Sequence, residues 1–140
     1  METVVLKIRI ISEEVIDRNK SWGFFYGFAL GNPKVCGAGG ILFLTADHYI
    51  TFKAGLGVGT NNFAKLFALK LLLSLALKKH IKHIHIFGDS MLIINWISGK
   101  FKVHNVHRAQ FLQEVIRLVD FFDEAVLNMF SGKEIHVLTS

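Results

Sequence analysis

Apolar and polar residues alternate from Ser21 to Gly55 in three short runs separated by turn residues. The runs are WGFFYGFAL, AGGILFL and DHYITFKAG, and each has the pattern of a β-strand. The stretch GNPK between the first two runs contains Asn32 and Pro33, which are typical of a turn. Strands joined by such short connections pair antiparallel. The pattern therefore predicts an antiparallel meander.

The periodicity then changes to that of helices alternating with strands. The stretch TNNFAKLFALKLLLSLALKKH predicts a long helix with Thr60 or Asn61 as its N-cap, buried on most of its circumference. It is followed by a strand (HIHIF), a helix from Ser90 to about Ser98, an amphipathic helix (VHRAQFLQEVIRLVDFFDEA) and a last strand (AVLNMF). A helix between two strands implies parallel pairing. We therefore predict an α/β fold, with a mixed five-stranded sheet of meander and parallel strands flanked by helices.

Length and composition predict one globular domain. The chain has 140 residues, of which 51% are hydrophobic. We divide it into an N-terminal extension of unassigned role (1–20), the domain (21–130) and a divergent tail (131–140). Cys36 is the single cysteine, which excludes an internal disulfide and favours the cytoplasm or nucleus.

Charge adds information about partners. The formal net charge of +5 suits an anionic partner such as nucleic acid or a membrane surface, although a basic surface that only maintains solubility is as common. Lys65 and Lys70 interrupt the most apolar stretch, and its uninterrupted part is too short to cross a membrane. We therefore expect no membrane partner.

Three blocks occur in a fixed order between about Trp22 and Phe122: WGFFYGFALGNPKVCGAGGILFL, GLGVGTNNFAKLFALKLLLSLAL and IFGDSMLIINWISGKFKVHNV. In residues, order and spacing they resemble the ribonuclease H type 1 family, in its plant reverse-transcriptase-like branch. The resemblance implies an RNase H-like fold that binds RNA/DNA hybrids. It also implies cleavage of the RNA strand by two Mg²⁺ ions held by four carboxylates, because several shared anionic ligands are needed to hold two divalent ions.

The resemblance assigns four acid positions, of which one retains an acid. Asp89 is that residue, whereas Tyr26, Lys65 and Thr139 stand at the other three positions. The nominal charge of the set changes from minus four to zero, because tyrosine is neutral and lysine is cationic near neutral pH. We therefore expect no cofactor, a metal bound through Asp89 if at all, and no catalysis. Lys65 either pairs with Asp89 or extends into solvent.

Candidate nucleic-acid contacts fall into two groups. Thr60, Asn61 and Asn62 suit a helix cap, and the resemblance implies that this helix start also contacts the RNA strand. In the second group, two polar residues on the predicted helix after Asp89 can reach a phosphate or sugar, and two lysines flank Phe101 in a stretch that reads as a backbone-binding loop or as a solvated turn. Its members are Ser90, Asn95, Lys100 and Lys102.

Two other patterns do not predict sites. His83 and His85 share one strand face and His80 lies nearby, but zinc requires three or four ligands. The glycines of AGLGVGT lack the spacing of a dinucleotide-binding turn and are predicted to be hairpin or turn glycines.

The end of the chain suggests a protein partner. The tail SGKEIHVLTS does not resemble the family's terminal helix, so we predict that this helix is missing and that the last strand is exposed. A protein partner could then cover the apolar surface near that strand.

Three functions remain open. We favour a nucleic-acid-binding domain, for an RNA/DNA hybrid or RNA, that has lost catalysis. An active hybrid ribonuclease would need other ligands, and the candidates stand at unsuitable places: Asp47, Asp120, Asp123 and Glu124. A protein-interaction or vestigial domain is the third reading.

Overall fold

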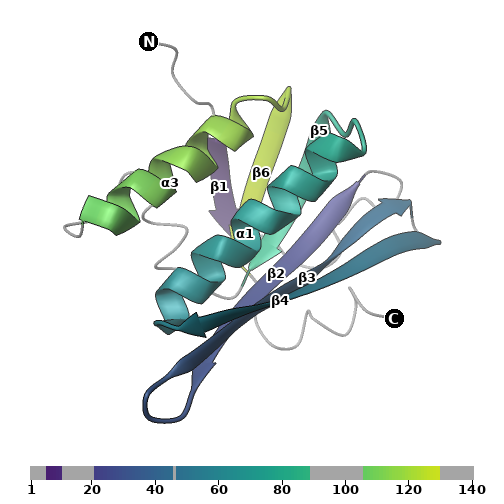
Figure 1. Ribbon diagram of the computed structural model, residues 1–140. Helices are drawn as coiled ribbons and strands as arrows, with labels where there is room; N and C mark the ends of the chain where they lie inside the picture. The colour runs from purple at the N-terminus through teal and green to yellow at the C-terminus, as the bar shows by residue number, and fades with distance from the viewer. Residues whose placement is uncertain (1–5, 11–20, 46, 89–105, 130–140) are drawn as a thin grey trace.

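The computed structural model describes residues 6–10, 21–45, 47–88 and 106–129. The elements are β1 (Leu6–Ile10), β2 (Trp22–Leu30), β3 (Val35–Thr45), β4 (His48–Val58), α1 (Asn61–Lys78), β5 (His83–Gly88), α3 (Val106–Val119) and β6 (Glu124–Met129). The strands form one mixed sheet in the order β1-β6-β5-β2-β3-β4, and α1 and α3 lie together on one of its faces (Figure 1). This architecture confirms the predicted α/β fold.

The meander and the parallel crossover also agree with the sequence analysis. β2 pairs antiparallel with β3, and β3 pairs antiparallel with β4, while β5 pairs parallel with both β2 and β6. Phe25, Leu42 and Ile86 from these strands belong to the same buried cluster as the leucines of α1. The hydrophobic core therefore lies between the sheet and the two helices.

The sheet has one more strand than predicted. β1, which comes from the segment predicted as an extension without a role, pairs parallel with β6 from Leu6–Ala125 to Ile10–Met129. β6 consequently lies inside the sheet, between β1 and β5. Ala125, Val126 and Leu127 are buried. The prediction of an exposed last strand is therefore wrong, because strand pairing covers both of its edges.

The helix α3 is shorter than its periodicity predicted. It ends at Val119, and the residues Glu124 and Ala125, which the prediction included in the helix, belong to β6. The backbone N–H groups of Asp123 and Glu124 donate to the carbonyl of Lys82, at 2.9 and 3.2 Å. These hydrogen bonds connect the chain to the start of β5, so the helix ends and a strand begins.

Packing between α1 and α3 is aromatic and partly charged. The ring of Phe111 on α3 lies 5.5 Å from that of Phe63 and 5.8 Å from that of Phe67, centroid to centroid. Lys70 forms an ion pair with Glu114 at 3.0 Å, and its ammonium lies 4.8 Å from the Phe111 ring. In the described part of the chain no helix is long and apolar enough to cross a membrane.

Gly55 and Gly57 lie in β4 and not in a hairpin turn, whereas Gly59 lies in the connection between β4 and α1. The register of β4 against β3 shifts between Cys36–Gly57 and Gly37–Gly55, so Leu56 is the extra residue of a β-bulge. Gly57 has a φ of 73°, which glycine adopts without steric cost. The predicted helix from Ser90 to Ser98, the tail 131–140 and the predicted absence of a terminal helix fall outside the described residues.

Candidate nucleic-acid interface

The site begins where β2 and β5 separate. Their register runs from Trp22–His85 to Phe24–Phe87, and β5 ends at Gly88, whereas β2 continues to Leu30. In the described part of the chain, no strand therefore pairs with this edge of β2 beyond Phe24. Open α/β sheets bind ligands at the carboxyl ends of parallel strands where neighbouring strands diverge.

A glycine brings α1 against this part of β2. A Cβ atom at Gly27 would lie 2.4 Å from the backbone carbon of Ala64 and 2.4 Å from the backbone nitrogen of Lys65. Only glycine allows the two backbones to approach so closely. The family resemblance assigned Tyr26 and Lys65 to one site. Both positions lie at the close backbone contact between β2 and α1.

Lys65 starts from the sheet-facing side of α1. Helical spacing places it in one stripe with Ala68, Leu69 and Leu72, whose side chains are 0–1% exposed in the core. Lys65 itself is half-buried. Among the described residues no carboxylate lies within ion-pairing distance of its ammonium group. The predicted pair with Asp89 concerns a residue outside the described part.

The ring of Tyr26 lies on the opposite face of the sheet from α1. A Cβ atom at Gly39, its partner on β3, would lie 2.5 Å from the Tyr26 hydroxyl. The ring centroid is 6.1 Å from that of Phe24. The structure thus brings the backbones of Tyr26 and Lys65 together but directs the Tyr26 ring away from the helix. Strand alternation with Gly27 could have predicted this orientation.

The start of α1 confirms Thr60 as the N-cap. Its hydroxyl oxygen accepts a hydrogen bond from the backbone N–H of Phe63 at 3.1 Å. Its carbonyl oxygen accepts from the thiol of buried Cys36 on β3 at 3.4 Å. Asn61 is exposed and Asn62 half-buried, in the first turn of the helix. The cap is therefore held in place by the sheet.

Lys34 is a basic residue at this site that the sequence analysis did not select. Its carbonyl accepts a hydrogen bond of 3.1 Å from the backbone N–H of Gly59, the residue before Thr60. Lys34 is exposed in the turn between β2 and β3. The turn and the helix start are distant in sequence and meet only through the pairing of β3 with β4.

The described carboxylates lie in other parts of the domain than Lys34 and the start of α1. Glu114 pairs with Lys70 on the side of α1 that packs against α3, and Asp47 lies in the turn between β3 and β4. The others lie between α3 and the start of β6, near the beginning of β5 and roughly 16 Å along that strand from Gly88. They are Asp120, Asp123 and Glu124.

The residues at two acid positions do not fit a two-magnesium centre. Mg²⁺ prefers carboxylate and other oxygen ligands, and an ammonium group such as that of Lys65 repels it. The neutral phenol of Tyr26 supplies no anionic charge. Within the described ranges, no three His, Cys, Asp or Glu side chains are grouped to hold a metal ion. The remaining predicted site residues lie outside those ranges: Asp89, Ser90, Asn95, Lys100, Lys102 and Thr139.

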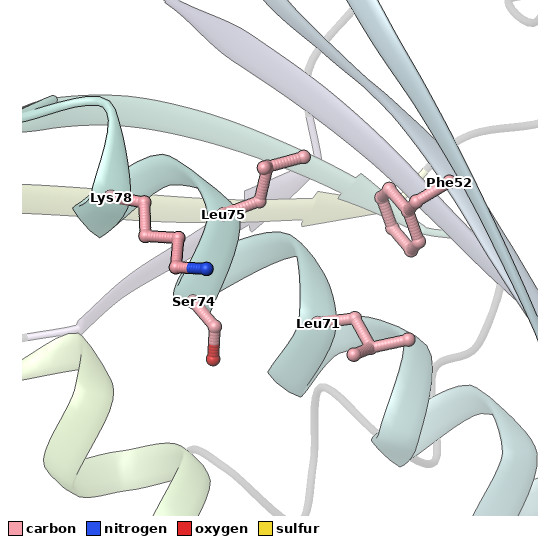
Figure 2. Close-up of a pocket in the computed structure, with 5 residues that line it drawn as sticks. All are labelled: Phe52, Leu71, Ser74, Leu75 and Lys78. Carbon is pink, nitrogen blue, oxygen red and sulfur yellow. The ribbon is translucent and has the colours of Figure 1, made fainter.

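A shallow apolar pocket of about 230 Å³ lies between the second half of α1 and β4. Figure 2 shows Phe52 and Leu71 at one end and Ser74 and Lys78 toward the other, with Leu75 on the wall. None of these residues belongs to the predicted site, which lies at the opposite end of α1. The pocket is therefore a separate feature of the molecule.

The fold is that of an RNase H-like domain. Residues 26–133 match the family model described as reverse transcriptase-like, so the chain belongs to that family. The match covers most of the chain and begins at Tyr26, the first of the acid positions that the resemblance assigned.

Solved structures agree on the fold. The structure superposes on RNase H1 from the archaeon Halobacterium salinarum with a TM-score of 0.73 and 23% identity, over 81% of this chain and 86% of that one. The N-terminal RNase H domain of Rv2228c from Mycobacterium tuberculosis gives 0.71 and 24%, over 82% and 90%. LC11-RNase H1 in complex with an RNA/DNA hybrid gives 0.71 and 20%, over 82% and 88%. No curated protein is significantly similar in sequence.

Proposed function

We propose that this domain binds nucleic acid, either an RNA/DNA hybrid or RNA, and does not cleave it. The observation that carries the proposal is the position of Lys65. Lys65 stands where the family has an acid, on the sheet-facing stripe of α1, and its backbone nitrogen lies at the close contact with Gly27. A cation at this place favours an anionic ligand and disfavours a divalent metal ion.

Loss of catalysis follows from the charge required for two divalent ions. In the family these ions stabilise the attacking and leaving oxygens of the cleaved phosphate, and four carboxylates share them. Here the nominal charge of the four positions is zero, with Lys65 offsetting Asp89. Mg²⁺ ions are the cofactors of active relatives, and this residue set is too weakly anionic to hold a pair of them.

Binding is supported by the surface around the helix start. Lys34, the Thr60 cap and Asn61 lie on one side of the domain, away from the described carboxylates. The structurally similar LC11-RNase H1 was solved with an RNA/DNA hybrid, and the net charge of +5 suits the same class of ligand. We propose that Asn62 and the second predicted group add further contacts: Ser90, Asn95, Lys100 and Lys102.

A titration with a fluorescently labelled RNA/DNA hybrid tests both parts of the proposal. Anisotropy measures binding at two salt concentrations, and a denaturing gel of the same samples, with Mg²⁺ or Mn²⁺ added, measures cleavage. We expect binding that weakens with salt and does not depend on the metal, because phosphate contacts release counterions. We expect no cleavage.

Two results would overturn the proposal. Cleavage that disappears in the Asp89→Asn variant would show an active centre with other ligands and remove the catalytic part. Absence of binding to hybrid and to RNA at low salt would remove the binding part and favour a protein-interaction domain.

A further inference from the structure

We infer that Lys65 and Lys34 form a phosphate-binding site that works without metal, in which the Lys65 ammonium group occupies the role of a metal cation. The ligand is the phosphodiester backbone of the bound strand. This inference rests on the proposed nucleic-acid binding and names the residues and the ligand chemistry that carry it.

Lys65 lies on a stripe of α1 that is otherwise buried. A lysine on the sheet-facing stripe of a helix is unusual, because its neighbours Ala68, Leu69 and Leu72 are buried in the core. Lys65 is half-buried where β2 is unpaired by β5, at the carboxyl end of the parallel strands. A lysine at the open edge of a strand suits an anionic ligand, because its ammonium group carries a full positive charge.

Two lysines from distant parts of the sequence, Lys34 and Lys65, lie on segments that adjoin the start of α1. The hydrogen bond from Gly59 to the Lys34 carbonyl fixes the β2–β3 turn beside the start of α1. Lys65 lies on the second turn of the same helix. The first turn of α1 contains no acidic residue, so no described side chain there opposes an anion.

The chemistry of lysine matches this role. An ammonium group binds phosphate as a point charge with three hydrogen-bond donors. It cannot activate water as two bound metal ions do. The same substitution therefore accounts for retained binding and for lost cleavage.

The salt dependence of hybrid binding tests the inference. The slope of log K against log salt concentration counts phosphate contacts, at about 0.9 per contact with a duplex. We expect Lys65→Gln and Lys34→Gln each to reduce the magnitude of the slope by about 0.9, and the double variant to reduce it by about 1.8. These values should not change on addition of Mg²⁺ or EDTA.

Matched controls separate local contacts from general charge effects. Lys79→Gln removes one exposed charge at the C-cap of α1, about 21 Å from Lys65 along the helix axis, and should leave the slope unchanged. Lys65→Arg keeps the charge and should keep the slope. Thermal unfolding of each variant verifies that the fold is intact under the conditions of the titration.

The outcomes distinguish this inference from the proposed function. If the unmodified protein binds and Lys65→Gln behaves like Lys79→Gln, the inference is wrong and the proposed function stands. If the unmodified protein does not bind the hybrid or RNA, both are wrong. An equal slope change in Lys65→Gln and Lys65→Arg would also contradict the inference, because a lost charge would then not be the cause.

Discussion

Gly27 determines how closely α1 approaches β2. Because a Cβ at this residue would lie 2.4 Å from backbone atoms of Ala64 and Lys65, which cannot rotate away, the Gly27→Ala variant must displace the helix. We expect a loss of about 1–3 kcal/mol in the free energy of unfolding, the usual cost of overpacking. Urea denaturation followed by circular dichroism measures it.

Gly55→Ala provides the control for this substitution. Gly55 also lies in a strand, but a Cβ there would meet no atom within 4 Å. Its effect should stay within roughly 0.5 kcal/mol, as for other surface substitutions. Equal effects of the two variants would show that the contact between Gly27 and α1 is not tight in solution.

Thr60 contributes to stability through its cap. Thr60→Ala removes the oxygen that accepts from the Phe63 N–H and should cost about 1 kcal/mol in thermal or urea unfolding. Thr60→Ser keeps that oxygen and should cost much less. A Ser variant as unstable as the Ala variant would assign the effect to the lost methyl group and not to the hydrogen bond.

At the scale of residues, the sequence predicted features that depend on neighbouring residues, but not features that depend on contacts between distant segments. The Thr60 cap follows from residue type and position at the start of a helical pattern. The position of Lys34 beside the start of α1 depends on a hydrogen bond between Lys34 and Gly59, which are 25 positions apart in the chain. The orientation of the Tyr26 ring was predictable in principle, because strand alternation places it opposite Gly27.

At the scale of elements, the sequence predicted the meander, α1 and β5 well because each has strong periodicity. It missed β1, a five-residue strand whose partner β6 lies more than a hundred positions later. It extended α3 too far, because the helical pattern continues through FFDEA while hydrogen bonds to Lys82 direct the chain into β6. Short strands and element ends depend on tertiary contacts that a local pattern does not contain.

The role of β1 can be tested by truncation. Removing residues 1–10 deletes β1 and exposes the edge of β6 from Ala125 to Met129. We expect a lower thermal midpoint and faster hydrogen exchange of the β6 backbone amides, because one row of ladder hydrogen bonds is lost. Removing residues 1–5 alone retains β1 and is the control. Unchanged exchange in β6 after the longer truncation would contradict the pairing.

At the scale of the whole molecule, a change of net charge tests the proposed loss of the metal centre and the proposed binding together. The double variant Tyr26→Asp and Lys65→Glu restores two acids and lowers the formal net charge by three, from +5 to +2. Without metal, its affinity for the hybrid should fall roughly tenfold or more, since a phosphate contact is replaced by repulsion.

Metal ions should act differently on this double variant and on the unmodified protein. Mn²⁺ should bind the variant, measured by isothermal titration calorimetry, and should restore part of its affinity for the hybrid, because a bound divalent ion again supplies positive charge beside the phosphate. The unmodified protein should show neither effect. Lys79→Glu, an exposed charge reversal at the far end of α1, controls for charge alone. If Mn²⁺ binds the Lys79→Glu variant equally well, the gain does not come from the restored acids, and the assignment of positions 26 and 65 to a former metal centre is wrong.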